Sequence, residues 1–375
     1  MNKTRKTALV VDWLTEGFGG GERVIKAVHD LFPHAPIYTS QYRPDKTSWL
    51  GEADVRVGWL NRLPTSLRRF VPFLRQFYFS RLDLSDYDLV ISITGAEAKG
   101  VKTRPGTLHV SYMHAPTQYY WTLYDDYMKD PGFGWLNPLA RLILSIMLGP
   151  LRRADYRAAQ RPDVVVANSS YIQQEIKKHY RRDSVVVWPN VGVEAIQQIP
   201  ASPAVRREGF IIYGRQVSWK RMDLAIAAAV RSGEKLKVIG DGPEHQRLLN
   251  LAAGNPSVEF LPRYDGIEDI VGLIRSSRAF LFTSLEPFGI APVEALAAGT
   301  PVIALKKGGA LDFIKEKVNG VFFEEQTVES LVAAINRFDA LEFNDSVVAK
   351  SAQAFSEAVF ARRLKQVIDA NVPNA

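Results

Sequence analysis

The chain has 375 residues, of which 46% are hydrophobic and none is cysteine, so we expect two domains with ordinary cores and neither disulfides nor thiolate metal sites. The net charge of +7 is uneven, because residues 1–190 carry +8 and residues 191–375 carry −1. A basic first half favours an anionic partner or acceptor, and the lack of a helix-turn-helix or zinc-finger signature argues against a nucleic-acid partner.

Strand-like apolar runs alternate with helical patterns along the whole chain. In the first half the runs are Thr7 to Val11, Leu89 to Ile93, Leu108 to Tyr112, Val164 to Ala167 and Val185 to Val187. In the second half they are Gly209 to Tyr213, Lys235 to Ile239, Val258 to Leu261, Ala279 to Thr283 and Pro301 to Ala304. This alternation predicts an α/β fold with two doubly wound parallel sheets. The segment from Gly192 to Glu208 has the composition of a linker.

A glycine cluster follows the first strand and opens a helical pattern. Gly19, Gly20 and Gly21 would leave backbone N–H groups free to hold an anion at the start of that helix. The G-x-G-x-x-G dinucleotide fingerprint fails in both possible registers, so the loop is either another kind of anion site or a flexible turn. The apolar run before Asp12 is too short for a signal peptide.

The stretch from Arg56 to Arg81 contains six arginines and no acidic residue, interleaved with aromatic residues. This mixture is typical of an interfacial element on anionic lipid. The alternative is a solvated insert whose aromatic side chains pack on the sheet. Just after it, Asp86-Tyr87-Asp88 precedes its strand instead of following it, which indicates a capping turn and no metal site.

His114 follows the strand Leu108 to Tyr112, at the end of the sheet where ligands of α/β proteins bind. It is a candidate ligand-binding residue, with a purely structural role as the alternative. Beyond it, the apolar stretch Leu136 to Leu151 is interrupted by Pro138, Arg141 and Pro150, so it does not read as a membrane span. We therefore expect a cytoplasmic protein, peripheral on the inner face of the cell membrane if the basic stretch binds lipid.

In the second half, Arg215 and Lys220 stand five positions apart in the loop after the strand Gly209 to Tyr213. Arginine can grip a phosphate with two hydrogen bonds, and lysine adds a compact charge. Together they would stabilise the charge that develops on a departing pyrophosphate. The alternative is a pair of ordinary surface charges.

The segment from Glu286 to Glu294 places two carboxylates eight positions apart, between the strand Ala279 to Thr283 and a short helix. Backbone N–H groups of Gly289 to Ala291 would face the same cleft and could hold a phosphate. Two acceptors that flank an anion site suit a sugar nucleotide. The alternative is an ordinary strand, loop and helix with two solvated glutamates.

These motifs resemble those of a known family. Gly214-Arg215 with Lys220, then Gly240-Asp241-Gly242-Pro243-Glu244, then Glu286 to Glu294 stand in the order seen in retaining GT-B glycosyltransferases of the glycogen-synthase-like superfamily, glycosyltransferase family 4. The segment from Tyr112 to Pro116, with Tyr119 and Trp121, resembles the Y-x-H-x-P…Y-x-W signature of its mannosyltransferase branch.

The resemblance implies two Rossmann-like domains that face a cleft, with residues 1–195 on the acceptor side, residues 196–351 binding the nucleotide sugar, and residues 352–375 as a helix that returns to the first domain. It implies that Arg215 and Lys220 hold the diphosphate. Glu286 would hold sugar hydroxyls and Glu294 the ribose hydroxyls. The implied donor contacts also include His114 near the reacting carbon, the glycine cluster, and the segment Phe288-Gly289-Ile290.

The resemblance implies a retaining, metal-independent transferase without a cofactor, with GDP-mannose as donor and a lipid-linked or polysaccharide acceptor. Pro262-Arg263 and Asp312 depart from the family pattern, and the first departure leaves the nucleotide base open. Three alternatives remain: a UDP-sugar donor, a GT-B epimerase acting on a free sugar nucleotide, and a non-enzymatic module that binds glycan or membrane.

Overall fold

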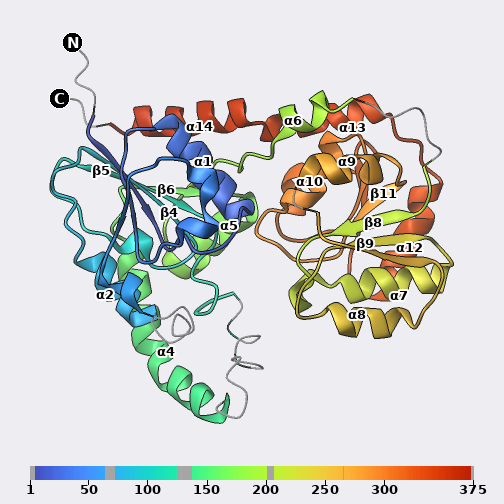
Figure 1. Ribbon diagram of the computed structural model, residues 1–375, viewed down its shortest axis with the longest axis horizontal. Helices are drawn as coiled ribbons and strands as arrows, with labels where there is room; N and C mark the ends of the chain where they lie inside the picture. Colours follow the sequence, from blue (N-terminus) through green and yellow to red (C-terminus); the bar gives the residue numbers. More distant parts are fainter. Residues whose placement is uncertain are drawn as a thin grey trace. The chain divides into compact units, whose positions relative to one another are not determined.

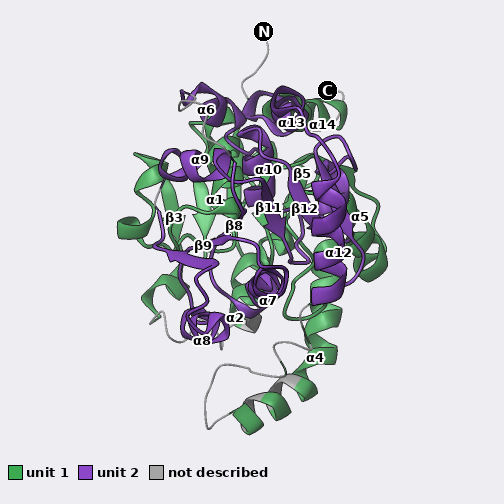
Figure 2. Cartoon of the chain, turned by 90° about the vertical axis from the view of Figure 1, so that its right-hand side faces the viewer, with its two compact units in different colours: residues 1–189, 361–375 green, residues 190–360 purple. Residues whose placement is uncertain are grey.

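The computed structural model describes residues 5–63, 72–122, 124, 128, 137–200, 207–264 and 266–372. The chain divides into two compact units, residues 1–189 with 361–375 and residues 190–360 (Figure 2). The first division therefore falls after residue 189, where the sequence suggested 195. The second falls after residue 360, inside the last helix, where the sequence suggested 351.

The first unit is built on a parallel sheet with the order β3-β2-β1-β4-β5-β6-β7, seven strands within the described residues. The strands are β1 (Thr7–Val11), β2 (Ile37–Thr39), β3 (Val55–Val57), β4 (Leu89–Thr94), β5 (Leu108–Met113), β6 (Val164–Ala167) and β7 (Val185–Val186). Every residue of β4 and β5 is buried, as expected for central strands with both faces covered.

The second unit repeats this plan with the parallel order β10-β9-β8-β11-β12-β13, six strands in the described part of the chain. The strands are β8 (Phe210–Tyr213), β9 (Leu236–Ile239), β10 (Val258–Leu261), β11 (Ala279–Phe282), β12 (Val302–Leu305) and β13 (Gly320–Phe323). The predicted α/β class with two parallel sheets is confirmed, and each predicted strand lies within one residue of its expected ends.

Helices cover both sheets (Figure 1). In the first unit they are α1 (Gly20–Leu31), α2 (Pro72–Ser80), α4 (Asn137–Ala159) and α5 (Ser170–Tyr180). In the second unit they are α6 (Val193–Gln198), α7 (Met222–Ser232), α8 (His245–Ala252), α9 (Ile267–Arg275), α10 (Ile290–Ala297), α11 (Ala310–Phe313), α12 (Val328–Asp339) and α13 (Asp345–Ser351). Figure 1 shows α9 and α10 on one face of the second sheet and α7, α8 and α12 on the other. No helix in the described ranges is long and apolar enough to cross a membrane.

The last helix, α14 (Glu357–Ala370), spans the division between the units, since residues from 361 onward belong to the first unit. Leu364 and Ile368 are buried. The Arg363 guanidinium lies 4.6 Å from the centre of the Trp188 ring, also in the first unit. The second half of α14 is therefore packed as part of the first unit.

Each sheet has one point where the strand order reverses direction. In the first sheet it lies between β1 and β4, and in the second between β8 and β11. Ligands of open α/β sheets bind outside the carboxyl ends of the strands at such switch points. The loops after these four strands carry the glycine cluster, Arg215, Lys220 and Glu286.

Candidate functional site

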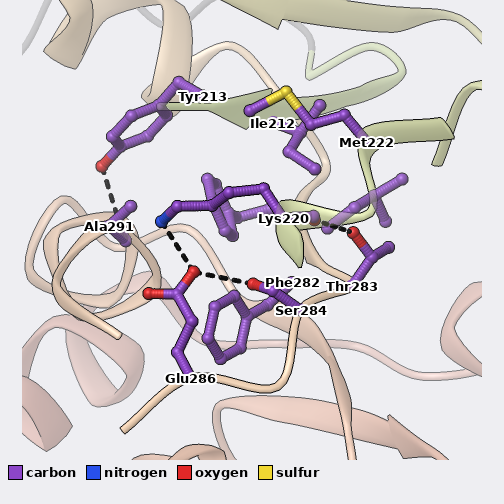
Figure 3. A pocket seen from close by; sticks show the side chains of 11 residues that line it. Ile212, Tyr213, Lys220, Met222, Phe282, Thr283, Ser284, Glu286 and Ala291 are labelled. Carbon is purple, nitrogen blue, oxygen red and sulfur yellow. Dashed lines mark hydrogen bonds and ion pairs between the residues drawn. The ribbon is translucent and has the colours of Figure 1, made fainter. Parts of the chain in front are cut away.

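Lys220 and Glu286 form an ion pair at the switch point of the second sheet. Lys220 ends a short 3₁₀ turn, Ser218–Lys220, after β8, and Glu286 lies in the loop after β11. Lys220 Nζ is 2.6 Å from Glu286 Oε1, and the Ser284 hydroxyl donates to the same oxygen over 2.7 Å (Figure 3). The two charged side chains are 24% and 16% exposed, so the pair is shielded from water but not sealed off.

A residue that directly follows β11, Thr283, holds the backbone around Lys220 by hydrogen bonds. The Thr283 hydroxyl lies 3.0 Å from the carbonyl oxygen of Lys220 and 2.9 Å from that of Arg221. Arg221 has a φ of 50°, in the left-handed region. Such a conformation is costly for a residue other than glycine and persists only where the surroundings hold it. The end of β11 therefore fixes where Lys220 stands.

Arg215 lies beside the start of the same loop. A Cβ on Gly214, whose φ is 139°, would lie 3.8 Å from Lys220 Cε and Nζ, so the lysine side chain passes over this glycine. Arg215 follows directly and is exposed. Among the described residues it makes no hydrogen bond or ion pair. The two predicted cations thus occur at one strand end, with Lys220 paired and Arg215 open to an anion.

Two glycines shape the loop that carries Glu286. Gly289, which precedes α10, has a φ of 110°, and a Cβ there would lie 2.8 Å from Phe282 Cζ. A Cβ on Gly309, in the loop after β12, would lie 2.2 Å from the carbonyl oxygen of Phe288. The Gly309 N–H donates to the Glu286 carbonyl oxygen over 2.9 Å. The loops after β11 and β12 therefore pack closely against each other, and a hydrogen bond from the second loop holds the backbone at Glu286.

Glu294 lies on α10 and is only 6% exposed. The Tyr213 hydroxyl is 2.9 Å from Glu294 Oε2 and 2.9 Å from the Ala291 carbonyl oxygen. Tyr213 ends β8. The second carboxylate is therefore oriented by the strand that also leads to Arg215 and Lys220.

The side chains of Phe288 and Ile290 differ in their surroundings. The Phe288 ring is buried and packs 5.6 Å from the Phe313 ring and 5.5 Å from the Phe355 ring. Ile290 is half-buried as the first residue of α10. Since the Phe288 ring belongs to the core, only the backbone of this residue could contact a donor.

A small hollow of about 10 Å³ lies beside the ion pair and would hold about one water molecule. Lys220 and Glu286 line it together with Ile212, Met222 and Phe282 (Figure 3). With the pair formed, little space remains between the two loops. An anion that enters this hollow to reach Lys220 would therefore compete with the Glu286 carboxylate for the ammonium group.

In the first unit, Asp12 ties the two loops of the switch point together. Its carboxylate accepts hydrogen bonds of 2.7 to 3.0 Å from four donors: the Thr94 hydroxyl and the backbone N–H groups of Gly95, Ala96 and Ala98. Asp12 is 5% exposed. The ends of β1 and β4 are thereby locked to each other.

His114 and the glycine cluster are brought together at this edge. A Cβ on Gly21 would lie 3.8 Å from His114 Nε2. Burial lowers the pKa of His114 to about 4, and the Asp12 carboxylate offsets only part of this effect. The ring is therefore neutral near pH 7. It can accept or donate a hydrogen bond there but carries no charge.

The start of α1, where Gly19 and Gly20 lie, already faces a carboxylate. Glu22 Oε2 would lie 3.0 Å from a Cβ on Gly19. Burial raises the pKa of Glu22, while the backbone N–H groups of Glu22 and Gly19 lower it in part. An acid three residues after the N-cap is the usual capping arrangement. Of the three glycine N–H groups expected to hold a ligand anion, that of Gly19 thus has a partner within the chain.

Arg75 corrects part of the membrane hypothesis for the stretch Arg56 to Arg81. Its side chain is 8% exposed, and its Nε donates to Glu97 Oε2 over 2.8 Å. Arg75 Nη2 donates to the Tyr119 hydroxyl over 3.0 Å. Burial raises the pKa of Glu97 although Arg75 opposes this. Arg75 is therefore an interior residue. Arg68 and Arg69 lie outside the described residues.

The described residues contain no group of three His, Cys, Asp or Glu side chains that could hold a metal ion. Asp88 lies at the amino end of β4. Its carboxylate accepts from the Lys6 N–H over 3.2 Å and from Arg104 over 3.1 Å. The Asp86 to Asp88 segment thus lies at the edge of the sheet opposite the switch point, as a capping turn would.

Several residues with structural roles at the two switch points or in the interior of the first unit were not predicted from the sequence. They are Asp12, Glu22, Tyr213, Ser284 and the pair Arg75 and Glu97. A signal existed for two of them, because Tyr213 ends a predicted strand and Ser284 directly follows one. The others act through partners distant in the sequence or through burial.

Comparisons with known proteins agree on the fold. Residues 196–359 match the family model described as Glycosyl transferases group 1. A GDP-mannose-dependent alpha-(1-6)-phosphatidylinositol monomannoside mannosyltransferase of Mycobacterium tuberculosis is 24% identical over 229 residues, 54% of this chain and 56% of that protein. An uncharacterized glycosyltransferase of Methanocaldococcus jannaschii, MJ1607, is 32% identical over 111 residues. The chain spans only 28% of that protein and the match covers 28% of this chain.

Solved structures match over nearly the full length. The lipopolysaccharide outer core galactosyltransferase WaaB is 17% identical, with a TM-score of 0.67 over 97% of this chain and 99% of its own. Anabaena Alr3699/HepE, in complex with UDP, is 19% identical, with a TM-score of 0.69 over 97% and 100%. The chain has the GT-B fold. The matches to the family model and to the curated relatives each cover part of the chain and show similarity to glycosyltransferases over that part.

Within this GT-B fold, the matched residues 196–359 fall inside the second unit. They include Lys220, Glu286 and Glu294. The part of the site at the switch point of the second sheet therefore lies in the segment that matches the family model.

Proposed function

We propose that this protein is a glycosyltransferase whose second unit binds the nucleoside diphosphate of a sugar donor. The observation that carries the proposal is the cluster at the switch point of the second sheet, where Arg215 is open and Lys220 is held 2.6 Å from Glu286. Cations at this edge suit a diphosphate, and the neighbouring carboxylate suits sugar hydroxyls. The match of residues 196–359 to the group 1 glycosyltransferases supports the same reading.

In the proposed reaction the bond between the sugar and the diphosphate breaks, and an oxocarbenium-like centre forms. Arg215 and Lys220 stabilise the charge on the leaving diphosphate. Glu286, displaced from Lys220, accepts hydrogen bonds from the sugar hydroxyls. Glu294, oriented by Tyr213, accepts from the ribose hydroxyls.

We further propose that the transfer retains the configuration of the sugar. The acceptor hydroxyl would attack from the side of the leaving group, with a phosphate oxygen as its base. No carboxylate is assigned as a covalent nucleophile of the kind that retaining glycosidases use. The neutral ring of His114 suits a residue that positions the sugar, and the glycine cluster beside it keeps its predicted role as a donor contact.

GDP-mannose remains the proposed donor, with a lipid-linked or polysaccharide acceptor, no metal ion and no cofactor. The mannosyltransferase of Mycobacterium tuberculosis, which is GDP-mannose-dependent by name, supports this choice. A UDP-sugar is the second candidate, because Alr3699/HepE was solved with UDP.

A panel of sugar nucleotides tests the proposal. A donor that binds the folded protein raises its thermal midpoint, so GDP-mannose should give the largest shift and UDP-sugars a smaller one. Turnover should then require a glycan acceptor and survive EDTA. A loss of activity in EDTA that Mg²⁺ restores would contradict metal independence.

The same panel separates the remaining alternatives. An epimerase would convert the sugar nucleotide without any acceptor. A non-enzymatic module would show no shift with any sugar nucleotide, and that result would refute the proposed function.

A further inference from the structure

Helix α4 carries the most exposed large apolar side chains of the described residues. Ile146 is 68% exposed and Leu142 is 57% exposed. They stand four positions apart, so they lie one above the other on the same face of the helix. Figures 1 and 2 both show the first turns of α4 leading away from the sheet of the first unit.

The same face carries positive charge. Arg153 and Arg157 are exposed. They stand seven and eleven positions after Ile146, spacings that keep them on its side of the helix. Residues 131–154 contain no Asp or Glu. We call Leu142, Ile146, Arg153 and Arg157 the α4 face.

The opposite side of the helix anchors it in the first unit. Leu151 and Ala158 are buried, and Asp155 is 1% exposed. Asp155 Oδ1 lies 2.6 Å from Lys99 Nζ, and its other oxygen accepts from Trp121 Nε1 over 2.7 Å. The second half of α4 is therefore anchored in the first unit. In the first half, the side chains of Leu142 and Ile146 are exposed to water.

We propose that the α4 face docks the protein on an anionic lipid surface. Apolar side chains beside exposed arginines on one helix face are the pattern of an interfacial helix. Each basic residue near such a surface adds attraction that falls off within a Debye length. The proposal assigns lipid binding to the α4 face instead of the stretch Arg56 to Arg81, in which Arg75 is an interior residue. It does not depend on the proposed transferase activity.

The charges favour lipid over a second copy of the chain. A two-fold contact would bring the α4 face against itself. The exposed arginines of both copies would then be desolvated in the contact, with no acidic residue in residues 131–154 to balance them. An anionic bilayer instead supplies the opposite charge and takes up Leu142 and Ile146.

The test is co-sedimentation of the full chain with vesicles of phosphatidylglycerol and phosphatidylcholine, compared with phosphatidylcholine alone. The wild type should bind the anionic vesicles, and binding should weaken as salt rises. R153E/R157E should weaken binding by on the order of thirtyfold or more, and L142S/I146S should also release the protein. Two matched control variants should still bind. R81E changes the exposed Arg81, whose guanidinium lies 4.3 Å from the centre of the Phe77 ring, and L311S changes an exposed apolar residue of the second unit.

Failure of the wild type to sediment at low salt would refute the proposal, as would full binding by both α4 variants. So would a wild-type dimer in sedimentation velocity without lipid that L142S/I146S makes monomeric, since that points to self-association. All four positions are exposed, so thermal midpoints and shifts with the sugar nucleotide panel should match the wild type. A protein that binds vesicles but no sugar nucleotide would keep this proposal and refute the transferase.

Discussion

Replacing Glu286 with glutamine separates two roles of this carboxylate. The amide keeps the size of the side chain and removes its charge. In the structure Glu286 Oε1 takes both the Lys220 ammonium, at 2.6 Å, and the Ser284 hydroxyl, at 2.7 Å. Under the proposed function, a diphosphate that binds Lys220 competes with this carboxylate, whereas the sugar hydroxyls donate hydrogen bonds to it.

The substitution should raise the affinity for a nucleoside diphosphate and lower the turnover. A partly exposed ion pair contributes about 0.2–1 kcal/mol. E286Q should therefore bind a nucleoside diphosphate without its sugar up to about fivefold more tightly. Turnover should fall by about 10²-fold or more, because a contact that strengthens in the transition state is lost.

Calorimetry with GDP and UDP and initial rates with the best donor of the panel measure both effects. Glu208→Gln is the matched control, because Glu208 pairs with Lys235 at 2.7 Å, just before β8 and β9, with both side chains largely exposed. It should change neither quantity. Weaker diphosphate binding by E286Q would show that Glu286 does not compete for Lys220, and near-normal turnover would refute its role toward the sugar.

Three further predictions follow from the geometry. Arg215→Ala and Lys220→Ala should each weaken nucleoside diphosphate binding, by about 1.5–3 kcal/mol for a charge-assisted contact; unchanged affinity of both variants in calorimetry would place them outside the site. Gly309→Ala should lower the thermal midpoint, because its Cβ would meet the Phe288 carbonyl oxygen at 2.2 Å. The control is Gly272→Ala, on α9, where an added Cβ meets no atom within 4 Å; it should be neutral or stabilise the protein by up to about 1 kcal/mol. Equal thermal midpoints of the two variants would contradict the close packing at Gly309. Burial, assisted by Arg161 and Arg182, lowers the pKa of His109 to about 3. The unfolded chain therefore binds more protons below its ordinary pKa of about 6.5, and stability should fall as pH drops from 6.5 toward 3. Urea unfolding at pH 7.5 and 5.0 should show a smaller loss for His109→Gln than for the wild type, and an equal loss would contradict the assignment.

The central strands were predictable because they are continuous apolar runs of four or more residues. The strands that were missed lack this signal. β2 has only three residues, and β3 places the exposed Arg56 at its centre. β13 starts with Gly320 after Asn319, a pair that reads as a turn. The structure uses that glycine for close approach instead, since a Cβ on it would lie 2.1 Å from the Val302 carbonyl oxygen.

The location of the site was also predictable, but its internal contacts were not. Residues after parallel strands meet at one edge of a sheet whatever their distance in the sequence, so Lys220 and Glu286 could be expected near each other. Their direct pairing accompanies a hydrogen bond from the Thr283 hydroxyl to the Lys220 carbonyl oxygen, which no local sequence pattern indicates. Likewise, nothing local in the sequence distinguishes Arg75 from the other arginines of its stretch. Its burial arises from Glu97 and Tyr119, which come from other elements.

Helix α14 has a consequence for how the protein matures on the ribosome. The second unit is one continuous segment, residues 190–360, and it can fold as soon as it has emerged. The first unit, although synthesised first, still lacks residues from 361 onward at that moment, including the buried Leu364 and Ile368. Domains usually complete in their order of synthesis, but here the nascent first unit must keep part of its apolar surface uncovered until translation of α14 is finished.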